Sequence, residues 1–257
     1  MKGNKVEKPP HKQQNSHYFN ESERDGRYKT IFNRRDVRSQ FKADAIPNDV
    51  LSRVLYAAHH APSVGFMQPW NFLVIKDQAV KTAVHEGFKK ANDAAADMFE
   101  PEKSKLYRKL KLEGILESPI NICITCDRSR TGSVVLGRTT NKEMDLFSTV
   151  CAVQNFWLAA RAEGLGVVLV SIFTQDDLRV ALNYTVEIIS IVHLGFGYVS
   201  HFNSKTDLQK AGWLNRTPIE DLVFFDQWVK EKNIEEDSLV KSLQQLKEFP
   251  YQWPKSD

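Results

Sequence analysis

The residues with the most evident chemical potential form one short run, Arg34-Arg35-Asp36-Val37-Arg38, near the end of a helix predicted over 22–38. If the helix continues through the run, Arg34 and Arg38 share a face, and the arginine between them lies about 100° away. Guanidinium groups crowded into one turn repel each other unless an anion lies among them, and a phosphate accepts their paired N–H groups. The run therefore suggests a phosphate site. Asp36 could instead neutralise the charges, so an ordinary solvated charge run is the alternative.

A second candidate segment is the loop 61–70, directly before a strand predicted over 71–75. It contains backbone donors, the hydroxyl of Ser63, the amide of Gln68 and large apolar groups. Pro62 ends the preceding helix, because the residue before a proline is pushed away from helical angles. This mixture of groups suits a flat heteroaromatic ligand with polar edges. A buried structural connection fits the same composition, so both interpretations stay open.

The cysteines and histidines favour no metal or redox site. Cys123 and Cys126 match a C-x-x-C pattern, but residues three apart in a strand point to opposite faces, so we expect buried structural thiols. His59 and His60 are adjacent at a helix end, with no third ligand at zinc spacing, and we expect no metal. The sequence contains no Walker loop, dinucleotide fingerprint or Gly-x-Ser-x-Gly elbow.

These residues need helices and strands to position them. Apolar residues at helical spacing predict helices over 22–38, 48–61, 77–117 with a break near Pro101, 145–163 and 174–182. Short apolar runs predict strands over 71–75, 119–127, 167–172 and 187–195. The helix over 145–163 is apolar on most faces, which is typical of a central buried helix. The order lacks a regular βαβ repeat, so we expect an α+β fold with a central sheet of four or five strands between helices.

Composition and charge narrow the class of protein. The chain has 257 residues, of which 42% are hydrophobic and 26% charged, and this range is that of ordinary globular proteins. The net charge of +3 arises within residues 1–30, which hold seven Lys/Arg and four Asp/Glu, whereas the rest is neutral. A nucleic-acid binder carries a basic stripe on its folded domain, so we expect no nucleic-acid partner. No apolar run reaches the ~18 residues of a membrane span, and no secretory leader is visible, so a cytoplasmic protein without a membrane partner is expected.

The chain divides into three predicted parts. Residues 1–20 read as a flexible polar arm, residues 21–230 as the folded domain, and residues 231–257 as a helical, aromatic tail. The last part of the chain carries large aromatics without the long apolar periods of a new core. Aromatic anchors are typical of interface cores, so we expect the tail to pack on the other subunit of a homodimer, in an exchange of C-terminal arms. Packing on its own chain is the alternative.

Taken together, these segments resemble the nitroreductase-like flavoprotein family. The shared elements are the arginine run at 34–38, Pro62-Ser63 with Gln68-Pro69-Trp70, Gly164-Leu165-Gly166 before an apolar strand, and Arg216. The resemblance covers roughly residues 28–230. Within the family it is strongest to the branch that destroys flavin, because Asp36 and Phe66 stand where ordinary members commonly have serine and asparagine. The segment 170–173 also matches that branch.

The resemblance implies a homodimer with FMN at the subunit interface. Members of this branch cleave reduced FMN with O2, as co-substrate, to 5,6-dimethylbenzimidazole and erythrose 4-phosphate, a step toward the lower ligand of vitamin B12. A separate flavin reductase supplies the reduced FMN. Two alternatives stay open: an NAD(P)H-dependent nitroreductase or reductive dehalogenase on the same fold, and a non-enzymatic FMN-binding protein.

The resemblance also implies roles for particular residues. The flavin phosphate and ribityl chain would be held by Arg34, Arg35, Arg38 and Arg216, with Val37 in the same binding segment. The partner chain would contribute part of the contacts from Pro62, Ser63, Gly65 and Gln68. The edge near flavin N5 would be lined by Leu169, Val170 and Ser171. Asp36 is the expected general base or acid, kept ionised by the arginines, and Ser171 is the second catalytic residue. A lid over 87–112 would place Met98 above the flavin.

Overall fold

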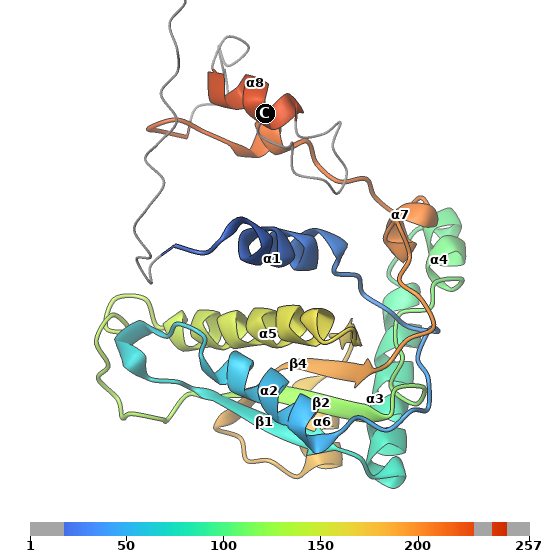
Figure 1. Ribbon diagram of the computed structural model, residues 1–257. Coiled ribbons are helices and arrows are strands. Elements are labelled where there is room, and N and C mark those ends of the chain that lie inside the picture. Colours follow the sequence, from blue (N-terminus) through green and yellow to red (C-terminus); the bar gives the residue numbers. More distant parts are fainter. Residues whose placement is uncertain (1–17, 229–237, 246–257) are drawn as a thin grey trace, which may run out of the picture.

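A four-stranded antiparallel sheet forms the centre of the computed structural model, which describes residues 18–228 and 238–245 (Figure 1). The strand order is β1-β2-β4-β3. The bounds of the strands are β1 Trp70–Ile75, β2 Ile120–Asp127, β3 Gly166–Val170 and β4 Ile188–Gly197. The two central strands are almost wholly buried, as expected of a sheet covered on both faces.

Helices cover both faces of this sheet (Figure 1). The larger core lies under α2 (Asn48–His59) and α5 (Met144–Ala162), and it includes the fully buried Phe156. The smaller core lies under α3 (Gln78–Ala96) and α6 (Gln175–Leu182). The remaining elements are α1 Glu21–Asn33, η1 Val64–Phe66, α4 Pro101–Tyr107, α7 Asp207–Lys210, η2 Ile219–Leu222 and α8 Ser238–Gln245. The predicted α+β class with a central sheet of four or five strands is confirmed, and the sheet has four. The helix α1 lies on the side of α5 that faces away from the sheet (Figure 1).

The predicted helix over 22–38 is too long, because α1 ends at Asn33. The backbone at Arg34 is extended, with φ −63° and ψ 134°. Asp36 then forms a parallel β-bridge with Val167, and the Val37 N–H donates to the Val167 carbonyl at 3.0 Å. Pairing with the outer side of β3 therefore replaces the last turns of the helix. The expectation that Arg34 and Arg38 share a helical face is wrong.

The predicted helix over 77–117 is also wrong in its last part, since α4 ends at Tyr107. Side chains from elsewhere bind the carbonyl groups of the segment that follows. The Lys81 Nζ donates to the Ser118 carbonyl at 2.6 Å, and the Asn121 Nδ2 donates to the Ile115 carbonyl at 3.0 Å. These bonds fix an irregular path into β2. The predicted break in the helix near Pro101 is confirmed, because α4 begins at that residue.

Three further expectations can be compared with the fold. Cys123 and Cys126 are both buried free thiols, as predicted, and burial raises the pKa of Cys123 to about 11. Most of the polar arm 1–20 and of the tail 231–257 lies outside the described residues. Within the described ranges, no helix combines the length and the apolar character that crossing a bilayer requires.

Candidate active site

Asp36 and Arg38 form the charged centre of the candidate site, on the outer side of β3. One carboxylate oxygen of Asp36 accepts the Leu169 backbone N–H at 2.9 Å, and the other accepts Nη2 of Arg38. Arg38 is buried, and its Nη1 lies 3.6 Å from the Asp207 carboxylate. In the part of the chain that the structure describes, the buried Nε of Arg38 has no hydrogen-bond partner. The alternation of an extended strand places Asp36 and Arg38 on one side of the segment.

Burial raises the pKa of Asp36, and the negative charge of Asp207 acts in the same direction. Arg38, the Leu169 N–H and Arg34 lower it, but their combined effect is smaller. The net direction is the reverse of the one expected from the neighbouring arginines alone. A carboxyl group whose pKa moves up toward neutrality can both accept and return a proton, which is the property that general acid–base catalysis requires.

The side chains of Arg34 and Arg35 contact different partners, although the two residues are neighbours in one extended segment. The Arg34 guanidinium lies over the Trp157 ring, 4.5 Å from its centroid. Burial lowers the pKa of Arg34, and the positive charges of Arg35 and Arg216 lower it further, while Asp36 opposes them. An anion bound at Arg34 and Arg216 would relieve this crowding of positive charge. The site therefore fits the phosphate of a ligand.

Arg35 binds the backbone. Its guanidinium donates to four carbonyl oxygens at 2.7–3.0 Å, those of Phe32, Arg34, Asn203 and Ser204. Two of these carbonyls belong to the end of α1 and its C-cap, and two belong to the segment before α7. Arg35 thus joins the arginine segment, residues 34–38, to the C-terminal part of the chain.

The loop 62–69 has a strained backbone. Gly65, Phe66 and Gln68 have φ values of 60°, 51° and 45°, in the left-handed region. A non-glycine residue held there costs about 1–3 kcal/mol and persists only where the surroundings enforce it. The Ser63 Oγ accepts the Gln68 N–H at 3.1 Å, and Nη1 of Arg130 donates to the Gln68 carbonyl at 2.8 Å. Such enforced strain is common at ligand sites.

This loop and the arginine segment contact opposite parts of α5. The Val64 N–H donates to the Ser148 Oγ at 3.2 Å, near the start of the helix. Arg34 covers Trp157, and the helix rise of 1.5 Å per residue puts residues 148 and 157 about 14 Å apart along the axis. One chain therefore brings together Arg34, Asp36 and Arg38, but it does not bring the loop 62–69 to them.

The remaining predicted residues lie at various depths. Val37 and Val170 are core residues, 2% and 1% exposed, so only their backbone groups are available to a ligand. Leu169 is half-buried, and Ser171 is exposed directly after β3. Met98 is 82% exposed in the connection between α3 and α4. The predicted lid thus consists of the end of α3, this connection and α4.

Three residues of the site region were not predicted, namely Trp157, Asp207 and Arg130. Trp157 belongs to an apolar helix, where the sequence gives no reason to separate it from the core. Asp207 and Arg130 meet their partners only through long-range folding, and no local pattern marks them. Sequence spacing could not have identified either residue.

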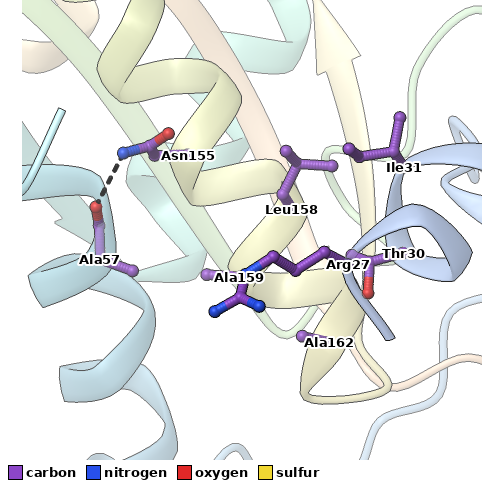
Figure 2. Close-up of a pocket in the computed structure, with 8 residues that line it drawn as sticks. All are labelled: Arg27, Thr30, Ile31, Ala57, Asn155, Leu158, Ala159 and Ala162. Carbon is purple, nitrogen blue, oxygen red and sulfur yellow. Dashed lines mark hydrogen bonds between the residues drawn. The ribbon is translucent and has the colours of Figure 1, made fainter. Parts of the chain in front are cut away.

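A separate cleft of about 340 Å³ lies between α1, α2 and α5 (Figure 2). Its walls are mainly apolar, and they are formed by Arg27, Thr30, Ile31, Ala57, Asn155, Leu158, Ala159 and Ala162. The Asn155 Nδ2 is already bound to the Ala57 carbonyl, at 3.2 Å. None of the predicted site residues lines this cleft, so it is not part of the candidate active site.

Comparison with known proteins agrees with this fold. Residues 31–198 match the model of the Nitroreductase family, and the chain belongs to this family. Over 200 residues it is 36% identical to the 5,6-dimethylbenzimidazole synthase of Rhodospirillum rubrum, covering 78% of this chain and 94% of the relative. It is 31% identical to a 5,6-dimethylbenzimidazole synthase of Rhodobacter capsulatus, with 79% and 97% covered.

Solved structures share the fold at low sequence identity. An oxidised iodotyrosine deiodinase bound to FMN and 3-iodo-L-tyrosine has a TM-score of 0.63 at 20% identity, covering 79% of this chain and all of the other. A BluB-like flavoprotein from Clostridium difficile 630 has a TM-score of 0.59 at 20% identity, covering 77% and 97%. These likenesses confirm the nitroreductase-like fold.

Proposed function

We propose that this protein is an aerobic 5,6-dimethylbenzimidazole synthase, which fragments reduced FMN with O2 to the benzimidazole and erythrose 4-phosphate. The observation that carries the proposal is the carboxylate of Asp36, at the position where the sequence resemblance implies a serine in ordinary members. It is fixed by the Leu169 N–H and by Arg38, and it lies close enough to Arg34 for the two charges to interact. The similarity to curated synthases over most of the chain supports the same activity.

FMN fits the groups that this chain presents. The crowded positive charges of Arg34 and Arg216 suit its phosphate, and the Nε of Arg38, which has no partner among the described residues, is a further donor. Bound as reduced FMN, the flavin supplies both the electrons for O2 and the carbon skeleton of the product. Arg34 and Arg216 bind and orient the phosphate, while Arg35 keeps the arginine segment attached to residues 203–204.

The proton chemistry falls to Asp36 and Ser171. Asp36 accepts and returns protons at its Oδ2, which faces Arg38, because its Oδ1 is held by the Leu169 N–H. Ser171, exposed directly after β3, donates a hydrogen bond to the flavin edge near N5. Met98 and the lid around it exclude water from the flavin ring. The exclusion of water strengthens the hydrogen bonds and charge interactions within the site.

The site is completed by a second copy of the chain. The loop 62–69 lies too far along α5 to reach the arginine segment of its own chain, so in a homodimer Pro62, Ser63, Gly65 and Gln68 act on the partner's flavin. The stacked Phe224 and Trp228, with Trp228 79% exposed, begin the aromatic arm that packs on the partner. A separate flavin reductase delivers the reduced FMN.

The direct test is to mix the purified protein with reduced FMN in air, without NAD(P)H. We expect the flavin absorbance to disappear and 5,6-dimethylbenzimidazole to form. Steady NAD(P)H oxidation with the flavin intact would contradict the proposal and favour a nitroreductase. Flavin that stays bound and unchanged would favour a binding protein.

A further inference from the structure

Arg38 lies between two carboxylates that come from different parts of the chain. Its Nη2 donates to Asp36, and its Nη1 lies 3.6 Å from the Oδ2 of Asp207 on α7. The Arg38 side chain is 8% exposed, whereas those of Asp36 and Asp207 are 24% and 31% exposed. One buried positive charge is thus shared by two negative charges, and it cannot fully neutralise both.

Asp207 is held in this place by its own contacts. Its Oδ1 accepts the Asn203 Nδ2 at 2.8 Å, and Arg35 binds the carbonyls of Asn203 and Ser204 at 3.0 and 2.8 Å. The segment 203–207 is therefore attached to the arginine segment at two points. This geometry keeps the Asp207 carboxylate directed at Arg38.

We propose that Asp207 is a positioning residue for Asp36: by sharing Arg38, it sets how strongly Asp36 holds a proton. The role rests on the proposed function, because it tunes the group that moves protons there. Asp207 need not touch the flavin. Removing its charge would leave Arg38 wholly to Asp36, and the carboxylate form of Asp36 would become more stable.

The charged groups around Asp36 are few among the described residues. Its own segment contributes Arg38 and Arg34, α7 contributes Asp207, and β3 contributes only the Leu169 N–H. The guanidinium of Arg35 binds backbone carbonyls. Of these groups, only Asp207 adds negative charge, and it acts to raise the pKa of Asp36.

The test is the Asp207→Asn variant of the full-length protein. The pKa of Asp36 is measured without flavin, by carbon-13 NMR of aspartate carboxyl groups, and the Asp36 signal is the one that Asp36→Asn removes. We expect this pKa to fall by about one unit in Asp207→Asn, since a nearby like charge disfavours the ionised form of a carboxyl group and its removal takes that effect away. The acidic limb of the pH–rate profile should move toward lower pH by the same amount. An unchanged pKa would overturn the inference.

Two variants separate this role from a merely structural one. Asp207→Glu keeps the charge, and it should restore the parent pKa of Asp36 to within a few tenths of a unit. Asp49→Asn removes an equal charge from an exposed pair with Arg53 on α2, and it should leave the pKa of Asp36 unchanged. A shift of the same size in Asp49→Asn would contradict a specific coupling.

If Asp207→Asn does not fold, Asn203→Ala gives the second test. It removes only the amide that holds the Asp207 Oδ1, so it should lower the pKa of Asp36 by a smaller amount in the same direction. No shift in this variant would count against the inference. The NMR titration does not depend on catalysis. A shifted pKa in a protein that forms no benzimidazole would refute the proposed function alone, and product without a shifted pKa would refute the role of Asp207 alone.

Discussion

If two subunits share each active site, as proposed, the activity of mixed dimers can be predicted quantitatively. One subunit carries Asp36→Asn, which removes the proposed base, and the other carries Gly65→Ala, which disturbs the loop 62–69. At Gly65, with φ 60°, an added Cβ would lie 2.7 Å from the Leu136 carbonyl oxygen and 2.8 Å from Cγ1 of Val135. Normal contact requires about 3.5 Å, so the loop must move by about 0.8 Å. A displacement of this size at a substrate contact can cost about 100-fold in rate.

Each homodimeric variant should therefore be nearly inactive. The purified heterodimer should regain about half the wild-type rate per dimer, because a two-fold dimer then contains one site with both halves intact. The two subunits carry different tags, are co-expressed and are purified over both tags, and benzimidazole formation from reduced FMN is measured. As a control, both changes are placed in one subunit of a heterodimer with Asp36→Asn, which leaves no intact site. A heterodimer as inactive as the homodimers would show that the two segments do not combine across the subunit interface into one site.

Three further predictions follow from single residues. Asp36→Asn should retain flavin binding, measured by fluorescence titration, and lose about 10²–10⁴-fold in product formation; near wild-type turnover would refute its role as the base. Arg34→Ala should weaken FMN binding at least tenfold, the expected cost of a lost charged hydrogen bond, while a merely solvated arginine would give no change. Burial lowers the pKa of His193 to about 3, so the unfolded chain binds the proton first as the pH falls below about 6.5, and stability falls with it. Urea unfolding should show about 2 kcal/mol less stability at pH 5 than at pH 7 from this group, and His193→Gln should remove that difference; an equal pH dependence in the variant would contradict it.

The fold was predictable where hydrophobic spacing alone determines the element. The helix α5 and the strand β2 match their predicted ranges to within one or two residues, because their apolar residues fill the centre of the molecule. The end of α1 was not predictable, because it is set by a β-bridge between Asp36 and Val167. Local sequence does not contain that long-range pairing, and the helical spacing of the arginines was misleading.

The candidate site was predictable only in part, for the same reason. Proline at position 62 indicated the loop, and the arginine run indicated an anion site. The burial that raises the pKa of Asp36, and the sharing of Arg38 with Asp207, arise only once β3 and α7 are in place. The separation of the two halves along α5 is likewise a property of the folded chain, and it is the observation that favours a site shared by two subunits.

The most direct test of the central claim is mass analysis of the products after one aerobic turnover of reduced FMN, with wild-type protein and Asp36→Asn side by side. We expect one molecule of 5,6-dimethylbenzimidazole for each flavin consumed by the wild type, and intact FMN recovered from the variant. Intact FMN from the wild type, or equal yields of the benzimidazole from both proteins, would contradict a flavin-cleaving site that works through Asp36.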